Sequence, residues 1–210
     1  KPPGTGPYCS LRKSIALIVK EFIIYYISGT GNTFRVAEWS AETAVREGVS
    51  SDVIAVQDAA PEKEVRDESD FLLGIYMPTH GFTAPWLILK SALRLPSVKK
   101  AQALVMSTRA GLKFGPLFTP GVSGSACFVI AFILFLKGYS VRGMRSIDMP
   151  SNWISIHPGL SVKSVEAIKQ RARPLVQKTV FSILSGKRQF IPLNNLYEIL
   201  FALPLAPLSL

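Results

Sequence analysis

Six consecutive residues, Ser28-Gly29-Thr30-Gly31-Asn32-Thr33, have the composition of an anion-binding loop. The two glycines permit tight turns that expose backbone N–H groups, and the other four residues each add a hydroxyl or amide donor. The loop lacks both the Gly-Lys-Ser/Thr ending of a nucleotide-hydrolysing P-loop and the spacing of a dinucleotide fingerprint. A monophosphate is therefore the ligand that it favours, the alternative being a polar turn that merely caps a helix.

Two regular elements must hold this loop in place. Phe22–Ile27 is a run of β-branched and aromatic residues, which predicts a buried strand. Phe34–Glu47 has apolar residues at helical spacing and is followed by Gly48, which predicts a helix that ends there. The loop would thus lie at a helix N-terminus, whose partial positive charge attracts an anion.

The rest of the chain alternates between short apolar runs and amphipathic segments. Further strands are predicted at 52–56, 70–76, 101–107 and 139–149, the last interrupted near Gly143, and helices at 61–69, 85–95, 125–137 and 162–184. This alternation predicts an α/β fold, a doubly wound five-stranded parallel sheet with helices on both faces. Ligands of such sheets bind beyond the C-terminal ends of the strands, which is where the anion-binding loop would lie.

The loop Ser28–Thr33, followed by Val36-Ala37, resembles the FMN-phosphate signature of flavodoxins. The predicted elements extend this resemblance over residues 22–186. Lys137-Gly138-Tyr139 and Met149-Pro150-Ser151-Asn152-Trp153 further resemble the flavodoxin part of fused flavodoxin–bacterial-ferredoxin proteins. The resemblance implies the strand order 2-1-3-4-5, FMN as the cofactor, and electron transfer without a catalytic acid or base.

The resemblance also implies that the loop after the third strand lies against the isoalloxazine ring. The residues concerned are Pro78, Thr79, His80, Gly81 and Phe82. Gly81 would flip its peptide to offer a carbonyl to flavin N5–H, and His80 or Phe82 would cover the ring, although His80 could equally be a polar turn residue. Trp86 is further away and is interpreted as a core residue of a helix face.

A long Gly-rich loop is expected after the fourth strand, and by resemblance it closes the other side of the flavin. The contacts expected there are Ser107, Thr108, Arg109, Ala110 and Gly111. Flavodoxins usually keep acidic residues near the flavin. Arg109 and Lys113 would reverse this charge, unless both point into water.

The charge of the chain is unevenly distributed. Residues 1–70 carry 8 basic and 11 acidic side chains, whereas residues 71–210 carry 16 basic and 3 acidic ones. This asymmetry favours an acidic partner. The resemblance to the fused proteins implies that this partner is an iron–sulfur protein or fused domain of the ferredoxin type. Peripheral contact with an anionic membrane is the other option, whereas nucleic acid is disfavoured because the basic residues are scattered among apolar runs.

Only two cysteines are present, Cys9 and Cys127. An iron–sulfur cluster needs about four thiolates, so this chain cannot hold one alone and the cluster cysteines of the fused proteins are missing. The cysteine usage indicates a reduced, cytoplasmic protein. No metal site is expected.

Three regions are expected: an N-terminal extension (1–20), an FMN-binding domain (21–188) that the resemblance implies, and an apolar tail (189–210) that could lead to another domain. Residues 126–136 are apolar on every side, yet too short to span a bilayer. Such a helix must be covered on all sides. Either the tail and this helix bury each other, or one of them docks a ferredoxin domain, a second subunit or a membrane.

The leading hypothesis is an FMN electron carrier between an iron–sulfur donor and a redox acceptor. It needs no catalytic acid or base, and only two histidines, His80 and His157, are present. The alternative is an FMN-dependent quinone or small-molecule reductase on the same fold. A third hypothesis is an interaction module that has lost the cofactor, which the intact phosphate loop disfavours.

Overall fold

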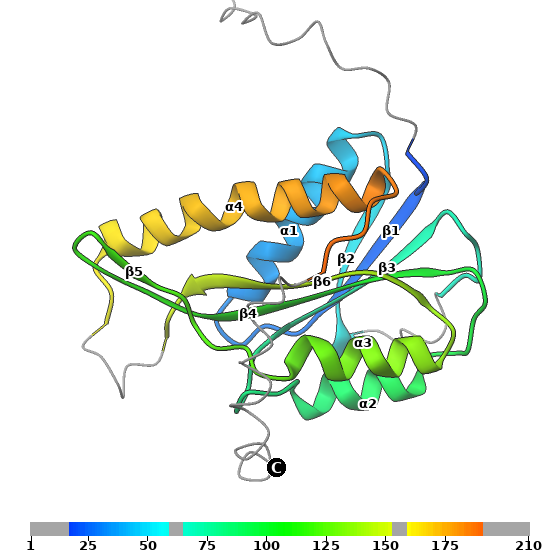
Figure 1. Ribbon diagram of the computed structural model, residues 1–210, viewed down its shortest axis with the longest axis horizontal. Coiled ribbons are helices and arrows are strands. Elements are labelled where there is room, and N and C mark those ends of the chain that lie inside the picture. The colour runs from blue at the N-terminus through cyan, green and yellow to red at the C-terminus, as the bar shows by residue number, and fades with distance from the viewer. Residues whose placement is uncertain (1–16, 59–64, 153–158, 191–210) are drawn as a thin grey trace, which may run out of the picture.

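The computed structural model describes residues 17–58, 65–152 and 159–190, and Figure 1 shows the arrangement of their elements. In chain order these are β1 (Glu21–Tyr26), α1 (Asn32–Arg46), β2 (Ser50–Ala55), η1 (Val56–Asp58), β3 (Phe71–Pro78), α2 (Trp86–Arg94), β4 (Gln102–Phe114), β5 (Leu117–Thr119), α3 (Ala126–Leu136), β6 (Ser140–Pro150) and α4 (Val162–Leu184).

The centre of the fold is a sheet in which β2, β1, β3, β4 and β6 run parallel in that order. The predicted order 2-1-3-4-5 is confirmed, with β6 as the fifth parallel strand. β1 lies between β2 and β3, so the chain adds strands first on one side of β1 and then on the other. The interruption expected near Gly143 is also confirmed, because the β4–β6 register shifts between Ala103 and Leu104.

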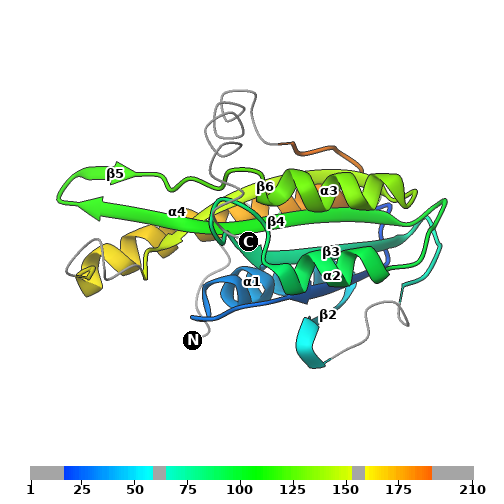
Figure 2. The same cartoon turned by 90° about the horizontal axis from the view of Figure 1, so that it is seen from below.

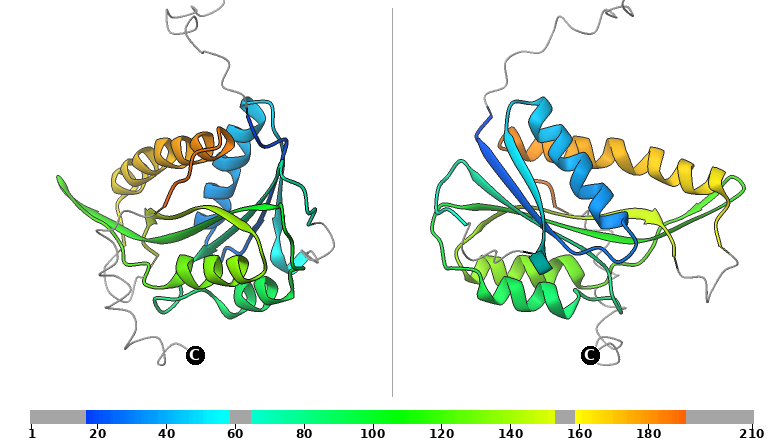
Figure 3. Two further views of the ribbon diagram at one scale, coloured as in Figure 1. Left: turned by 45° about the vertical axis from the view of Figure 1, so that its right-hand side comes forward. Right: turned by 180° about the vertical axis from the view of Figure 1, so that it is seen from behind.

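Helices cover both faces of this sheet. Figures 1 and 2 show α1 and α4 on one face and α2 and α3 on the other, and Figure 3 shows the same two layers at an oblique angle and from behind. Each layer has its own cluster of buried apolar side chains against the sheet. β3 is buried on both faces, which explains its nearly continuous apolar sequence.

The fourth strand is longer than predicted. The segment expected as a Gly-rich loop, from Ser107 onward, continues β4 to Phe114 and then turns back as β5. Its residues pair with β6 as far as Gly111 opposite Pro150, so a distant strand, and not local composition, determines the conformation. The hairpin rests on α4, where Arg171 stacks on the Phe118 ring at 4.2 Å.

The helix predicted at 61–69 is absent from the part of this range that the structure describes. Residues 61–64 lie outside the described part, and residues 65–69 are not helical. Asp67 instead accepts the backbone N–H groups of Lys99 and Lys100, at 2.8 and 2.6 Å. The charged segment that was interpreted as a helix therefore contains a carboxylate that holds the loop after α2 by hydrogen bonds.

The apolar helix α3 is buried only on the side that faces the sheet. Phe132, Phe135 and Leu136 are exposed, so no described residue covers its outer side. Most of the predicted tail, residues 191–210, and most of the N-terminal extension, residues 1–16, lie outside the described residues. None of the described helices is both long and apolar enough to cross a bilayer.

Candidate functional site

A cavity of about 620 Å³ opens at the C-terminal ends of β1, β3, β4 and β6. Its volume lies within the range of small-molecule sites. It includes the point beside β1 where the strand order reverses, which is the usual ligand position in open α/β sheets. Its lining residues are Ser28, Gly29, Thr30, Asn32, Thr33, Pro78, Thr79, His80, Gly81, Thr108, Arg109, Ala110, Met149, Pro150, Ser151 and Asn152.

The loop from Ser28 to Thr33 forms one wall of this cleft. Gly31 directly precedes α1 with a φ of 82°, a conformation that favours glycine. A Cβ placed at Gly29 or Gly31 would meet nothing within 4 Å, so the space in front of the loop is open. No side chain caps the start of α1 within the described residues, which leaves its first N–H groups available to an anion.

Side chains of the same loop fix it to the neighbouring strands. Asn32 Nδ2 donates to the Pro150 carbonyl at 2.9 Å, and the hydroxyls of Thr33 and Thr108 lie 2.9 Å apart. Asn152 Nδ2 donates to Thr30 Oγ1 at 2.5 Å. Polar side chains that were expected as anion donors thus also have structural partners, and the backbone N–H groups are the donors that the geometry leaves free.

The second wall is a tight turn after β3. The backbone N–H and C=O of His80 both hydrogen-bond Thr83, each at 3.0 Å. Gly81 and Phe82, the two residues between them, have φ values of 53° and 63°, which indicates a type I′ turn. Positive φ is strained for an aromatic residue, by about 1–3 kcal/mol. Flipping the Gly81–Phe82 peptide would give a type II′ turn and return Phe82 to negative φ, so the predicted flip has a conformational driving force here.

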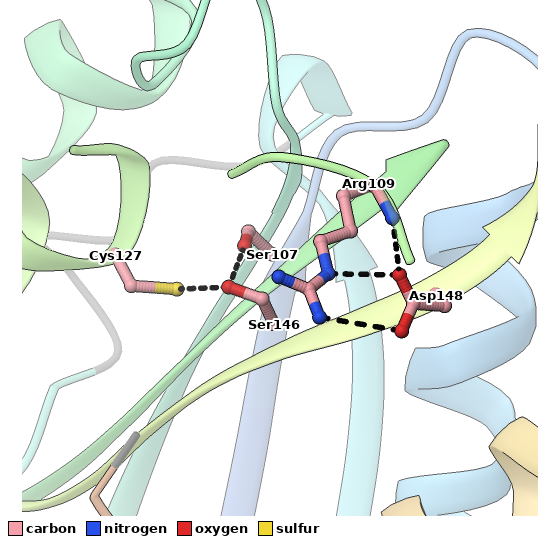
Figure 4. Close-up of polar contacts among 6 residues, drawn as sticks. Ser107, Arg109, Cys127, Ser146 and Asp148 are labelled. Carbon is pink, nitrogen blue, oxygen red and sulfur yellow. Dashed lines mark hydrogen bonds and ion pairs between the residues drawn. The ribbon is translucent and has the colours of Figure 1, made fainter. Parts of the chain in front are cut away.

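The third wall is the end of β4, and its charge differs from the expectation. Figure 4 shows that the Arg109 guanidinium forms a two-pronged pair with Asp148 of β6, with Nε–Oδ1 at 2.8 Å and Nη2–Oδ2 at 3.3 Å. Only 9% of the Arg109 side chain is exposed. It is neither directed into water nor an uncompensated positive charge. Lys113 bonds the Gly115 carbonyl within the hairpin and does not line the cleft.

Asp148 joins a third segment to this pair. Its Oδ1 accepts the Gly121 N–H at 2.8 Å. Gly121 packs against the β4 backbone so closely that a Cβ would lie 2.7 Å from the Ala110 carbonyl oxygen. The carboxylate therefore clamps β4, β6 and the segment between β5 and α3 beside the cleft.

A small polar cluster lies deeper between β4, β6 and α3. Ser107 Oγ donates to Ser146 Oγ at 2.9 Å, and Cys127 Sγ lies 4.0 Å from the latter (Figure 4). Burial raises the pKa of the Cys127 thiol, so it is neutral at physiological pH. Within the described residues, no group of histidine, cysteine or carboxylate side chains could hold a metal ion.

The structure brings most of the predicted site residues together. Gly31, Phe82, Ser107 and Gly111 belong to the same walls but do not line the cavity. Trp86 also lies outside the lining and is 66% exposed, so its interpretation as a core residue is wrong. The segment from Met149 to Asn152 lines the cavity and was not predicted to do so. Its position at the end of the fifth parallel strand was the signal that could have identified it.

No model of a known protein family matches the sequence, and no curated protein matches it. Solved structures that are similar include rubredoxin oxygen:oxidoreductase of Desulfovibrio gigas, at 15% identity and a TM-score of 0.48, covering 80% of this chain and 38% of that one. The flavodoxin of Streptococcus pneumoniae TIGR4 has 16% identity and a TM-score of 0.49, covering 75% and 99%. A putative quinone reductase of Klebsiella pneumoniae has 10% identity and a TM-score of 0.47, covering 78% and 85%.

These likenesses are weak, because the identities are low and the TM-scores are below 0.5. This chain spans less than two fifths of the length of the Desulfovibrio protein. The strand order and the position of the cleft are therefore the basis of the functional assignment.

Proposed function

We propose that this chain binds FMN and transfers electrons. The observation that carries the proposal is the meeting of the phosphate loop, the turn after β3 and the end of β4 around one cleft. The phosphate would be held by the loop from Ser28 to Thr33, and the ring would lie between the turn at 78–82 and the strand end at 108–110.

The residues present fit this cofactor. The loop offers backbone N–H groups at a helix N-terminus and open space before its two glycines, which suits a phosphate. Thr79 lines the cleft, and its Oγ1 is buried without a hydrogen-bond partner in the described part of the chain. A buried hydroxyl of this kind is costly unless a ligand or water satisfies it.

Electron transfer is favoured over acid–base chemistry by the residues of the cleft. His80 and Arg109 are the titratable side chains in the lining, and Arg109 is paired with Asp148. Bound FMN would supply the redox chemistry itself, accepting and releasing electrons at its ring. The chain would bind the phosphate, orient the ring and, with the Arg109–Asp148 pair, leave the β4 wall electrically neutral.

An acidic iron–sulfur protein of the ferredoxin type is the donor that we propose. Its support is charge: residues 71–147 contain nine basic and no acidic side chains. Complementary charge mainly raises the association rate, and salt screens it over about 8 Å at physiological ionic strength.

Flavin titrations test the proposed cofactor site. We expect the fluorescence of FMN to be quenched when FMN binds to the protein. We also expect FMN to bind at least tenfold more tightly than riboflavin, which lacks the phosphate. Each charge-assisted hydrogen bond to the phosphate contributes about 1.5–3 kcal/mol. Equal affinity for the two flavins, or binding of neither, would reject the assignment.

A matched pair of variants locates the phosphate. Thr30→Glu places a carboxylate in the exposed part of the loop and should weaken FMN binding at least tenfold while leaving riboflavin binding unchanged. Thr119→Glu makes the same change at an exposed position of β5, outside the cleft, and should alter neither.

A further inference from the structure

The outer surface of the α2–α3 layer is apolar and has no described element packed on it. Its exposed large side chains are Trp86, Leu87, Leu93, Phe132, Phe135 and Leu136. On each helix these residues lie opposite those that pack on the sheet, such as Ile88 of α2 and Ile130 of α3. Figure 2 shows the two helices side by side, so their outer faces form one surface.

Basic residues border this surface from the middle of α2 to the loop beyond its C-terminal end. Lys90 and Arg94 are exposed on α2, and Lys99 and Lys100 are exposed in the loop that follows it. Neither helix contains an acidic residue. The Asp67 carboxylate, which accepts the N–H groups of Lys99 and Lys100, offsets part of this charge. The surface therefore combines bulky apolar side chains with a net positive border.

We propose that the α2–α3 surface docks on an anionic lipid bilayer. Peripheral membrane-binding surfaces combine Trp, Phe and Leu side chains that enter the interface with Lys and Arg side chains that reach the headgroups. On α3 the outer residues offer no hydrogen-bonding side chain, and lipid acyl chains require none. An acidic protein partner would need such groups to satisfy its own polar atoms.

A second copy of the chain fits this surface less well. In a twofold contact both copies present the same surface, so the four exposed cations of each copy meet no acidic side chain on α2 or α3 of the other. A bilayer containing anionic lipids supplies the missing opposite charge, because each Lys or Arg near its surface then contributes favourably.

Docking in this orientation leaves the cleft accessible. The cleft opens at the C-terminal ends of the strands, and no residue of α2 or α3 lines it. A soluble redox partner could therefore approach the flavin while the α2–α3 surface is occupied.

Vesicle flotation with the full chain tests the proposal. We expect the protein to float with vesicles of phosphatidylcholine containing 30 mol% phosphatidylserine, and not with phosphatidylcholine alone. Phe132→Ser with Phe135→Ser should reduce the partition coefficient at least tenfold, and Lys90→Glu with Arg94→Glu should do the same at low salt. Trp86 fluorescence should shift to the blue on binding, and the shift should be lost in Trp86→Phe.

Matched controls exclude a general effect of charge or hydrophobicity. Phe114→Ser with Leu117→Ser removes two exposed apolar side chains from the hairpin, and Lys163→Glu with Lys178→Glu reverses two exposed charges on α4. Both should float like the wild type. All these positions are exposed, so the variants should keep the thermal unfolding temperature of the wild type. Measuring that temperature verifies that each variant is folded.

Three results would overturn the proposal. Wild-type protein that fails to float indicates that the surface is covered otherwise, by residues 191–210 or by another protein. Equal loss in the control variants indicates non-specific adsorption. A dimer in sedimentation that Phe132→Ser with Phe135→Ser dissociates would identify a second copy as the occupant.

Discussion

Replacing Asp148 with asparagine should destabilise the protein by about 2–4 kcal/mol. Asp148 accepts two hydrogen bonds from Arg109, at 2.8 and 3.3 Å, and one from the Gly121 N–H at 2.8 Å. Removing one partner of a buried pair leaves the other charge uncompensated, at a cost of about 3–5 kcal/mol. The loss expected here is smaller than that range because 20% of the Asp148 side chain is exposed and asparagine still accepts one hydrogen bond.

Urea unfolding followed by circular dichroism measures this loss, and a double-mutant cycle isolates the pair. Asp148→Asn, Arg109→Met and the double variant should give a coupling energy above about 1 kcal/mol, so the double variant should be more stable than the sum of the single losses implies. The control is the exposed pair Arg173–Glu42, whose N–O distance of 2.9 Å is similar. Its disruption by Glu42→Gln should cost less than about 1 kcal/mol.

If Asp148→Asn costs no more than Glu42→Gln, or if the two changes in the clamp are additive, the Arg109–Asp148 pair does not hold the strand ends together. The m-value must remain constant through the series, since a change would indicate an altered denatured state.

Two smaller predictions concern a glycine and a carboxylate. Gly138→Ala should destabilise the protein far more than Gly48→Ala, although both glycines have a φ of 87°. A Cβ at Gly138 would lie 2.0 Å from the Val98 carbonyl oxygen, whereas one at Gly48 would meet nothing within 4 Å. Equal losses of stability in urea unfolding would contradict this. Backbone N–H groups of Lys100 and Lys99 lower the pKa of Asp67 below its usual 3.8, so its contribution to stability is complete above that pH and disappears as the pH falls through the lowered value. Asp67→Asn should therefore flatten the acid side of the stability profile, and an unchanged profile between about pH 5 and 2 would show that these hydrogen bonds do not persist.

Local patterns were sufficient to predict most of the sheet and helices. The helix at 162–184 was predicted with the bounds that the structure gives. In the structure its ends are set locally: the Ser161 side chain accepts the Ser164 N–H at its start, and Gly186 follows its end with a φ of 83°. The strand β1 and the loop that follows it were predicted for the same reason. The strand order came from the resemblance and not from periodicity.

The charge and shape of the third wall could not be predicted in this way. Residues from Thr108 to Gly111 have a polar, glycine-containing composition that is typical of loops, yet they pair with a strand about 39 positions later. That pairing places Arg109 opposite Asp148. The positive charge of Arg109, which seemed to distinguish this site from those of flavodoxins, is therefore neutralised. Contacts of this range depend on the assembled sheet, and one sequence does not reveal them.

The helix α3 connects the proposed docking surface to the cleft. At its N-terminal end, the Ser125 N–H donates to the Phe82 carbonyl of the strained turn at 2.8 Å, and the preceding Gly121 is held by Asp148. Along its outer side, the same helix presents the exposed Phe132 and Phe135. Protein interiors are close-packed and transmit displacements, so a shift of α3 would move both the turn and the β4 wall. The layer that offers the apolar surface therefore also fixes two of the three walls that would hold the flavin.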